Sequence, residues 1–208
     1  MKYNPVIGMP RTYTKKKRAQ DQEETRKRIV EATVSLHQEI GGPSTTISAI
    51  AERAGVERAT VYRHFPDEHS LLLGCTGHYL ALNPPPDPTV WAGIDNREQR
   101  LRTALTEIYA YHRRTEVIMA RATIDVPQMP VLREVLTPMF AFWQMVRDLL
   151  AEPWAAEENG SFFRAGIGHA IAFQTWQSLV RNEGVEDGEA VTLMLGMICA
   201  VARKPCCE

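Results

Sequence analysis

The sequence predicts an all-α protein of about nine helices, arranged in two domains. Apolar residues recur at spacings of three and four through most of the 208 residues, which is the period of helices with one buried face. No segment shows the strict alternation of apolar and polar residues that half-buried strands require. Four prolines within residues 83–88 interrupt the helical pattern, so we expect domains at residues 21–82 and 83–208.

Composition favours an ordinary cytoplasmic protein. Hydrophobic residues make up 44% and charged residues 24% of the chain, which suits a substantial core. The longest strongly apolar stretch, Leu193–Ala202, has 10 residues, about half of what a membrane-spanning helix needs. Polar and acidic residues follow the basic N-terminus, where a secretory signal would be apolar. We therefore expect no membrane partner, and Cys75, Cys199, Cys206 and Cys207, which lack a disulfide-framework spacing, fit a reducing compartment.

Positive charge is concentrated at the N-terminus. Residues 1–20 contain six basic and no acidic residues, although the whole chain has a net charge of −1. Residues 1–82 carry 12 Lys and Arg against 9 Asp and Glu, or +3, and residues 83–208 carry 12 against 16, or −4. A basic flexible arm at residues 1–20 suits a nucleic-acid backbone or an anionic membrane surface, and a tail that only aids solubility is the alternative. The arm residues expected to neutralise phosphates are Lys15, Lys16, Lys17 and Arg18.

The first two helices are bounded by strong local signals. A helix that begins at Asp21 has one apolar face, and Gly41-Gly42-Pro43 ends it. Thr45 or Thr46 can cap a second, short helix. Gly55 can adopt the positive φ that ends this second helix, so a tight turn follows it.

A third helix at Arg58–His64 completes a helix-turn-helix, and a fourth follows at Glu68–Leu82. The third helix is narrow enough for the DNA major groove, where Arg can contact guanine and where hydroxyl and imidazole groups can reach phosphates. The residues available for such contacts are Arg58, Ala59, Thr60, Tyr62, Arg63 and His64. Two helices packed in a larger bundle are the alternative, and the basic arm favours the DNA-binding interpretation.

These residues also carry a family resemblance. The pattern Thr46-Ile47-x-x-Ile50-Ala51-x-x-Ala54-Gly55-Val56-x-x-x-Thr60-Val61-Tyr62-Arg63-His64-Phe65, followed by Leu71, resembles the N-terminal signature of the TetR family of bacterial transcriptional regulators. The resemblance covers about residues 25–72. It implies a homodimeric repressor that binds a palindromic double-stranded DNA operator and is released by a small hydrophobic ligand. It also implies that Thr46, Tyr62 and His64 contact phosphates and that Arg58, Ala59 and Thr60 face bases.

Two departures from the family pattern introduce acidic residues. The family commonly has a Lys three residues after the Phe, where this chain has Glu68, and often a Ser at the opening of the third helix, where this chain has Glu57. Glu68 suits the first turn of a helix but lacks the phosphate contact of a Lys. The alternative function is therefore a small-molecule-binding helical protein with weak or lost specific DNA binding.

The second domain is expected to contain five helices. They are a helix from a cap at Asn96 to Arg114, and helices at 116–124, 130–150, 161–182 and 188–203, with a kink at Pro138. The last two are apolar on more than one face. They are either internal core helices or, as the resemblance supports, the pair that joins a second copy in a four-helix bundle.

Methionine and aromatic residues of this domain suggest an adaptable apolar lining for a small hydrophobic ligand. Ordinary core packing is the alternative for each of them, and Trp91 either closes a pocket or anchors its loop. The broader set includes His112, and the residues selected as ligand-binding candidates are Tyr109, Met119, Phe140, Trp143, Phe173 and Trp176.

Catalytic and metal sites lack the required spacings. His64 and His69 flank Glu68, but they do not form the HExxH pattern, and Pro66 breaks the helix that would align them. The chain contains no GxSxG, Walker A or GxGxxG motif. We therefore expect neither enzymatic activity nor a metal or other cofactor.

Overall fold

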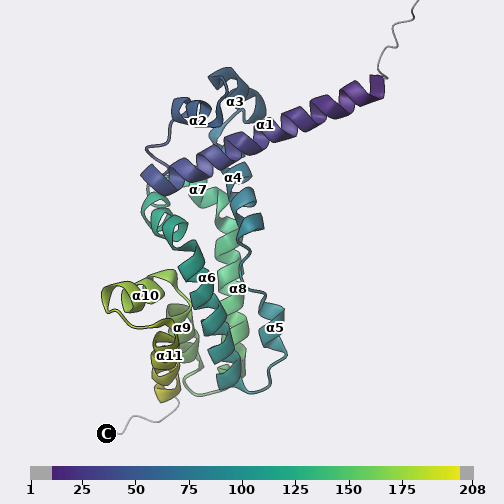
Figure 1. Ribbon diagram of the computed structural model, residues 1–208. Helices are drawn as coiled ribbons and strands as arrows, with labels where there is room; N and C mark the ends of the chain where they lie inside the picture. The colour runs from purple at the N-terminus through teal and green to yellow at the C-terminus, as the bar shows by residue number, and fades with distance from the viewer. Residues whose placement is uncertain (1–10, 202–208) are drawn as a thin grey trace, which may run out of the picture. The chain divides into compact units, whose positions relative to one another are not determined.

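The computed structural model describes residues 11–201, with side chains for residues 16–200 (Figure 1). The described secondary structure is entirely helical, which confirms the all-α prediction, and the chain divides into two units between Tyr79 and Leu80. The helices are α1 (Arg11–Ile40), α2 (Ile47–Ala54), α3 (Arg58–His64), α4 (Glu68–Leu82), α5 (Pro88–Ala92), α6 (Arg97–Asp125), α7 (Pro130–Val135), α8 (Thr137–Ala151), α9 (Gly160–Ala170), α10 (Phe173–Gln177) and α11 (Asp187–Val201), with a 3-10 turn η1 (Glu152–Trp154) and a π-helical turn η2 (Ser178–Asn182).

Helix α1 begins ten residues earlier than the sequence pattern predicts. The apolar period starts only at Ile29, but residues 11–28 contain neither Gly nor Pro and are rich in Lys, Arg, Gln and Glu, which are good helix formers. The backbone of residues 11–20, predicted as part of a flexible arm, is therefore helical, and residues 1–10 lie outside the described part of the chain.

The N-terminal unit has a small core of its own. Helix α1 packs against α2, and α2 packs against α3. The buried apolar residues come from α1 to α4 and the turn after α3: Ile29, Val30, Ala32, Leu36, Ile50, Ala51, Ala54, Val61, Phe65, Leu71, Leu72 and Cys75. Burial raises the pKa of the Cys75 thiol to about 12, so this cysteine is an inert core residue at neutral pH.

The C-terminal unit is organised around α6, which packs against α11, while α8 packs against α9 (Figure 1). Helix α6 is continuous where the sequence pattern predicted two helices that meet near Thr115. The Thr115 side chain is buried within this helix, and its hydroxyl donates to the carbonyl oxygen of Tyr111 at 2.8 Å, so the buried hydroxyl has a hydrogen-bond partner without a break in the helix.

Two helices predicted as continuous are interrupted. Pro138 occupies the first turn of α8, where its missing N–H costs no hydrogen bond, so it begins a new helix rather than kinking one. The predicted helix 161–182 breaks after Ala170, and Ala172 has an extended backbone with φ −70° and ψ 139°.

Trp91 anchors the segment between the proline run and α6. Its side chain is fully buried, and its indole N–H donates to Glu107 Oε2 at 2.8 Å.

Across the described residues, none of the helices is long and apolar enough to cross a membrane.

Candidate nucleic-acid interface

Helix α2 is capped at both ends by the residues that flank it. The Thr46 hydroxyl accepts a hydrogen bond from the Ala49 N–H at 3.2 Å and caps α2. Gly55 has φ +64°, and its N–H donates to the Glu52 carbonyl at 3.1 Å, while the Val56 N–H donates to the Ala51 carbonyl at 3.0 Å. This left-handed cap directs the chain into α3 within three residues.

Helix α3 separates buried from exposed residues as the sequence predicted. Val61 and Phe65 are buried against the core. The outward-facing residues are Arg58, Ala59, Tyr62 and Arg63, which are exposed, and Thr60 and His64, which are partly buried. The structure thus brings the predicted contact residues of α3 onto one short helix, with Thr46 exposed at the start of α2.

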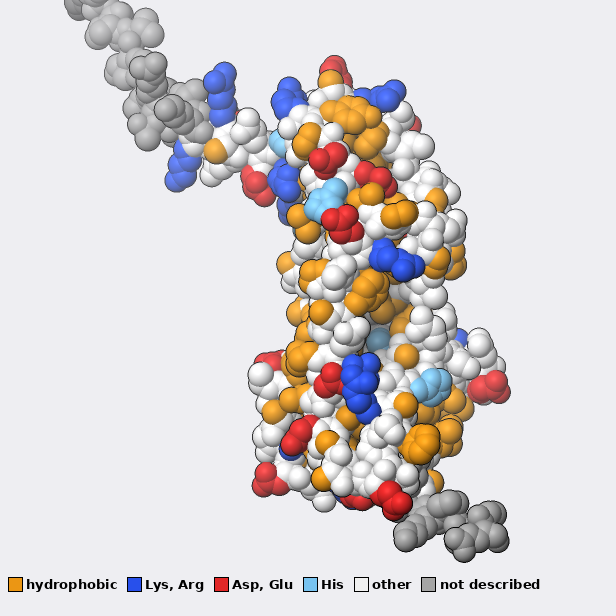
Figure 2. All heavy atoms as spheres, turned by 180° about the vertical axis from the view of Figure 1, so that it is seen from behind, with side chains coloured by type: hydrophobic (Ala, Val, Ile, Leu, Met, Phe, Trp, Pro, Cys, Tyr) orange, Lys and Arg blue, Asp and Glu red, His pale blue; other side chains and the backbone are white. Residues whose placement is uncertain are grey.

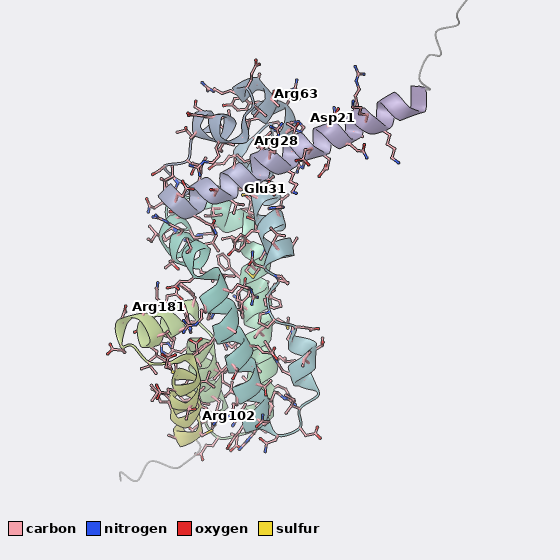
Figure 3. All side chains as sticks on the ribbon, viewed as in Figure 1. Asp21, Arg28, Glu31, Arg63, Arg102 and Arg181 are labelled. Carbon is pink, nitrogen blue, oxygen red and sulfur yellow. The ribbon has the colours of Figure 1, made fainter. Side chains whose placement is uncertain are left out.

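Arg63 is held along α3 by a contact within the helix. Its Nη2 donates to the Thr60 hydroxyl at 2.9 Å, one turn earlier. Figure 3 labels Arg63 on α3 and Arg28 on α1. A guanidinium held in this way loses less side-chain freedom when it binds an acceptor.

Sequence reasoning missed the part played by two arginines of α1. Arg26 Nη1 donates to the carbonyl oxygen of His64 at 3.2 Å, and its guanidinium carbon lies 4.2 Å from the centre of the Phe65 ring. Arg28 Nη1 donates to the carbonyl oxygen of Ala54 at 3.0 Å. These side chains attach α1 to the C-terminal ends of α3 and α2, where positive charge is favourable. A basic cluster in a sequence does not distinguish such helix-end contacts from free surface charge.

The surroundings of His64 favour its neutral form. Partial burial, followed by the positive charges of Arg63 and Arg26, lowers the pKa of its imidazole below the usual 6.5, and Glu23 opposes this effect. In the protein without DNA, the neutral form of His64 is therefore favoured at pH 7, and this form can donate a hydrogen bond to a phosphate.

The described basic residues of the predicted arm lie along the first turns of α1. Lys16, Lys17 and Arg18 are exposed, and Figure 2 shows basic side chains projecting from this end of the helix. The side chain of Lys15 lies outside the described residues. The phosphate contacts of all four residues stay a prediction.

Glu57 and Glu68 are both exposed at helix starts. Glu57 precedes α3 and makes no side-chain cap to it. Glu68 lies in the first turn of α4, where the cap is Asp67, whose Oδ1 accepts from the Ser70 N–H at 2.7 Å. That bond lowers the pKa of Asp67, so this carboxylate is ionised at the helix start.

The ligand-binding candidates of the C-terminal unit do not form a uniform group. Tyr109, Phe173 and Trp176 are buried in its core, and Met119 and Trp143 are partly buried against it. Phe140 is 41% exposed and is not part of that core cluster. The Tyr109 hydroxyl donates to the Ala170 carbonyl at 3.1 Å, and the Trp176 indole donates to Asp187 Oδ1 at 3.0 Å. Their role in ligand binding stays a prediction.

His112 is the polar group at the centre of these aromatic residues. It is 1% exposed, and its Nε2 lies 3.0 Å from the carbonyl oxygen of Ile171. Its Nδ1 is buried, and no group in the described part of the chain hydrogen-bonds to it. Burial lowers the pKa of His112 to about 4, so the imidazole is neutral at pH 7. Within residues 11–201, no group of three or more His, Cys, Asp or Glu residues is placed to hold a metal ion.

Comparisons with known proteins support the resemblance. The sequence model of the bacterial regulatory proteins of the tetR family matches residues 29–75, which include α2 and α3. The HTH-type transcriptional repressor KstR of Mycolicibacterium smegmatis is 29% identical over 121 residues, which are 58% of this chain and 52% of that protein. The uncharacterized HTH-type transcriptional regulator TtgW of Pseudomonas putida is 37% identical over 75 residues, 35% of this chain and 56% of that protein. The chain thus spans about half the length of the curated relatives it matches.

Solved structures agree on the fold of most of the chain. A TetR-like transcriptional regulator from Rhodococcus sp. RHA1 superposes with a TM-score of 0.62 at 16% identity, and covers 86% of this chain and 97% of its own. NalD, the secondary repressor of the MexAB-OprM multidrug efflux pump in Pseudomonas aeruginosa, superposes with a TM-score of 0.59 at 21% identity. The superposition covers 86% of this chain and 96% of NalD. Residues 29–75 thus carry the helix-turn-helix domain of the tetR family of bacterial regulatory proteins, and most of the chain has the fold of a TetR-like regulator.

Proposed function

We propose that the protein is a cytoplasmic DNA-binding transcriptional repressor that is released from a palindromic operator by a small hydrophobic ligand. The observation that carries this proposal is the exposed face of α3, where Arg58, Ala59, Tyr62 and Arg63 point away from the core after a closed Gly55 turn. A short helix with such side chains can enter the major groove, with Arg58 against base edges and Tyr62 against the phosphate backbone.

A palindromic operator requires two copies of the recognition helix, so the proposal includes a homodimer through the last two helices that the sequence predicts, at residues 161–182 and 188–203. The first of these contains α9, and the second corresponds to α11. Helices α9 and α11 pack against each other, and each leaves large apolar side chains exposed. They are Phe162 on α9 and Leu193 and Met197 on α11. Joined to a second copy, these faces would form a four-helix bundle and bury this apolar surface. The two recognition helices would then be about 34 Å apart, one turn of DNA.

Release by a ligand requires that the ligand bind one conformation of the protein more tightly than another. The aromatic residues around His112 support a small hydrophobic ligand in the C-terminal unit, because they form an adaptable apolar environment with one polar centre.

The test is fluorescence anisotropy with the duplex DNA that lies beside the protein's own gene, compared with random duplex of equal length at about 50 mM and about 200 mM salt. The wild type is expected to prefer its own duplex at both salt concentrations. R58A is expected to lose about 1–3 kcal/mol of this preference, because Arg58 is assigned to base edges. R133A is the charge-matched control, because Arg133 is exposed on α7 in the other unit.

Weak binding that disappears with salt for every duplex would contradict the proposal and favour a small-molecule-binding protein without specific DNA recognition. An equal reduction in R58A and R133A would show that Arg58 contributes only charge.

A further inference from the structure

His112 lies inside a shell of five aromatic rings. The ring centres of Tyr109, Tyr111, Trp143, Phe173 and Trp176 are 5.6 to 6.3 Å from the centre of its imidazole. Four of these residues are buried, and Trp143 on α8 is partly exposed. The shell therefore comes closest to solvent at Trp143.

The hydrogen bond of Nε2 determines where the proton of His112 lies. A carbonyl oxygen only accepts hydrogen bonds, so Nε2 must carry the proton that it shares with the Ile171 oxygen. Nδ1 of the neutral ring is then unprotonated and presents a lone pair. Because a buried acceptor that loses its water partners is unfavourable unless it is paired, nearly all such groups have a partner in folded proteins.

The neighbouring polar groups do not supply that partner. The Tyr109 hydroxyl donates to the Ala170 carbonyl, and the Trp176 indole donates to Asp187. The nearby arginines are also engaged. Arg113 pairs with Asp187 at 2.7 Å and Arg181 pairs with Glu116 at 2.6 Å, so their charges are matched outside the shell.

We propose that Nδ1 of His112 is the polar anchor of the effector site, and that the effector is a small, uncharged, mainly apolar molecule carrying one hydrogen-bond donor, a hydroxyl or an N–H, at the end that meets His112. This inference rests on the proposed function for the statement that the C-terminal unit binds an effector, and it adds the chemical class of that effector. A ligand group that can only accept hydrogen bonds, such as an ether oxygen, would be repelled by the Nδ1 lone pair, so we expect such a ligand to bind more weakly. A charged group is disfavoured because the aromatic shell offers it no counterion.

The experiment uses two matched pairs of probes, phenol with anisole and 1-naphthol with 1-methoxynaphthalene. Within each pair the apolar body is similar and only the first member has an O–H. Isothermal titration calorimetry of the full-length protein without DNA is expected to show at least about tenfold tighter binding of the hydroxyl member. In H112F, where a ring of similar size replaces the imidazole, the two members are expected to bind equally. H169F is the control, because His169 is an exposed histidine of α9, and it is expected to retain the wild-type preference.

A second measurement needs no variant and so does not depend on the folding of H112F. Nitrogen NMR of labelled histidine in the wild type is expected to show His112 Nδ1 as unprotonated and unbonded in the free protein, and to move upfield when phenol or 1-naphthol binds. Three results would overturn the proposal: equal binding within both probe pairs, no binding of any probe, or an Nδ1 resonance already in the hydrogen-bonded position. Because no step involves DNA, failure of operator binding would leave these results interpretable, and failure here would leave the DNA-binding function intact.

Discussion

The Nε2 of His112 on α6 donates a hydrogen bond to the main-chain carbonyl of Ile171, 3.0 Å away, at the point where α9 ends. The preceding carbonyl, that of Ala170, accepts a hydrogen bond from the Tyr109 hydroxyl. The last carbonyls of a helix have no partner within it, and here two side chains of α6 provide partners. These two hydrogen bonds explain why the chain can leave the helical conformation at Ala172. The carbonyl oxygens of Ala170 and Ile171 are buried there, and each still has a hydrogen-bond donor.

Acid is expected to destabilise the protein through His112. Its pKa is about 4 in the folded state and about 6.5 in the unfolded state, so the unfolded state binds more protons between these values. The contribution of His112 to stability is therefore complete above pH 6.5 and is lost as the pH falls to about 4, by about 3 kcal/mol at most. Urea unfolding at pH 7, 5 and 4 should show this loss in the wild type and a smaller slope in H112F. An identical pH dependence in both proteins would contradict the assignment.

Substitution of Gly55 is expected to destabilise the N-terminal unit. Gly55 has φ +64°, and the nearest atom to an added Cβ is Arg28 Nη1 at 3.8 Å, so G55A meets backbone strain rather than a steric clash. The expected cost is about 1–2 kcal/mol. G77A is the matched control, because Gly77 lies within α4 with no atom within 4 Å of an added Cβ, and it should stabilise by about 0.5–1 kcal/mol. Thermal unfolding measures both effects, and a neutral G55A would show that the turn relaxes.

Removal of the basic side chains at the start of α1 is expected to weaken DNA binding and its salt dependence. For every phosphate that the protein no longer neutralises, the slope of log affinity against log salt should fall by about 0.9. The triple variant K16A/K17A/R18A tests this by anisotropy over a range of salt concentrations. K27A is the control, because Lys27 is already paired with Glu31 at 3.7 Å in the same helix. An unchanged slope in the triple variant would assign these residues to solubility rather than to DNA.

Replacement of Glu68 by Lys is expected to strengthen DNA binding. The substitution places a positive charge at the start of α4, at the position where the family pattern given above commonly has a Lys, and is expected to add one phosphate contact. E134K makes the same change of charge on α7 in the other unit, where Glu134 is also exposed. A large gain in E68K alone, measured by anisotropy, would show that the wild-type contact set is marginal. Equal gains in both variants would show only the effect of net charge.

A charge on the exposed face of α11 is expected to disrupt the proposed dimer. Met197 is 56% exposed, and M197E would place a carboxylate in the apolar interface. V117E is the control, because Val117 on α6 is also 56% exposed but lies outside α9 and α11. Analytical ultracentrifugation should show a monomer for M197E and a dimer for V117E. A dimeric M197E would place the interface elsewhere.

Local signals in the sequence were sufficient to predict the helix-turn-helix. The bounds of α3 and α4 agree with the prediction, because Gly55, Pro66 and the acidic first turn of α4 act within a few residues of the chain. The outward face of α3 was predictable for the same reason, since residues two positions apart lie on nearly opposite sides of a helix, which separates Ala59 and Arg63 from Val61.

Contacts between distant residues decided the remaining features. Arg26 and Arg28 belong to a basic cluster in the sequence, and only the folded chain brings them to the carbonyls of His64 and Ala54. No proline near Ala170 signals the break after α9 in the sequence. The break depends instead on side chains of α6, about sixty residues earlier in the chain. In the same way, composition identified an aromatic-rich second unit, but tertiary packing made His112 its buried polar centre. Periodicity and turn chemistry act along the chain, whereas burial and hydrogen-bond partners depend on which helices meet in space.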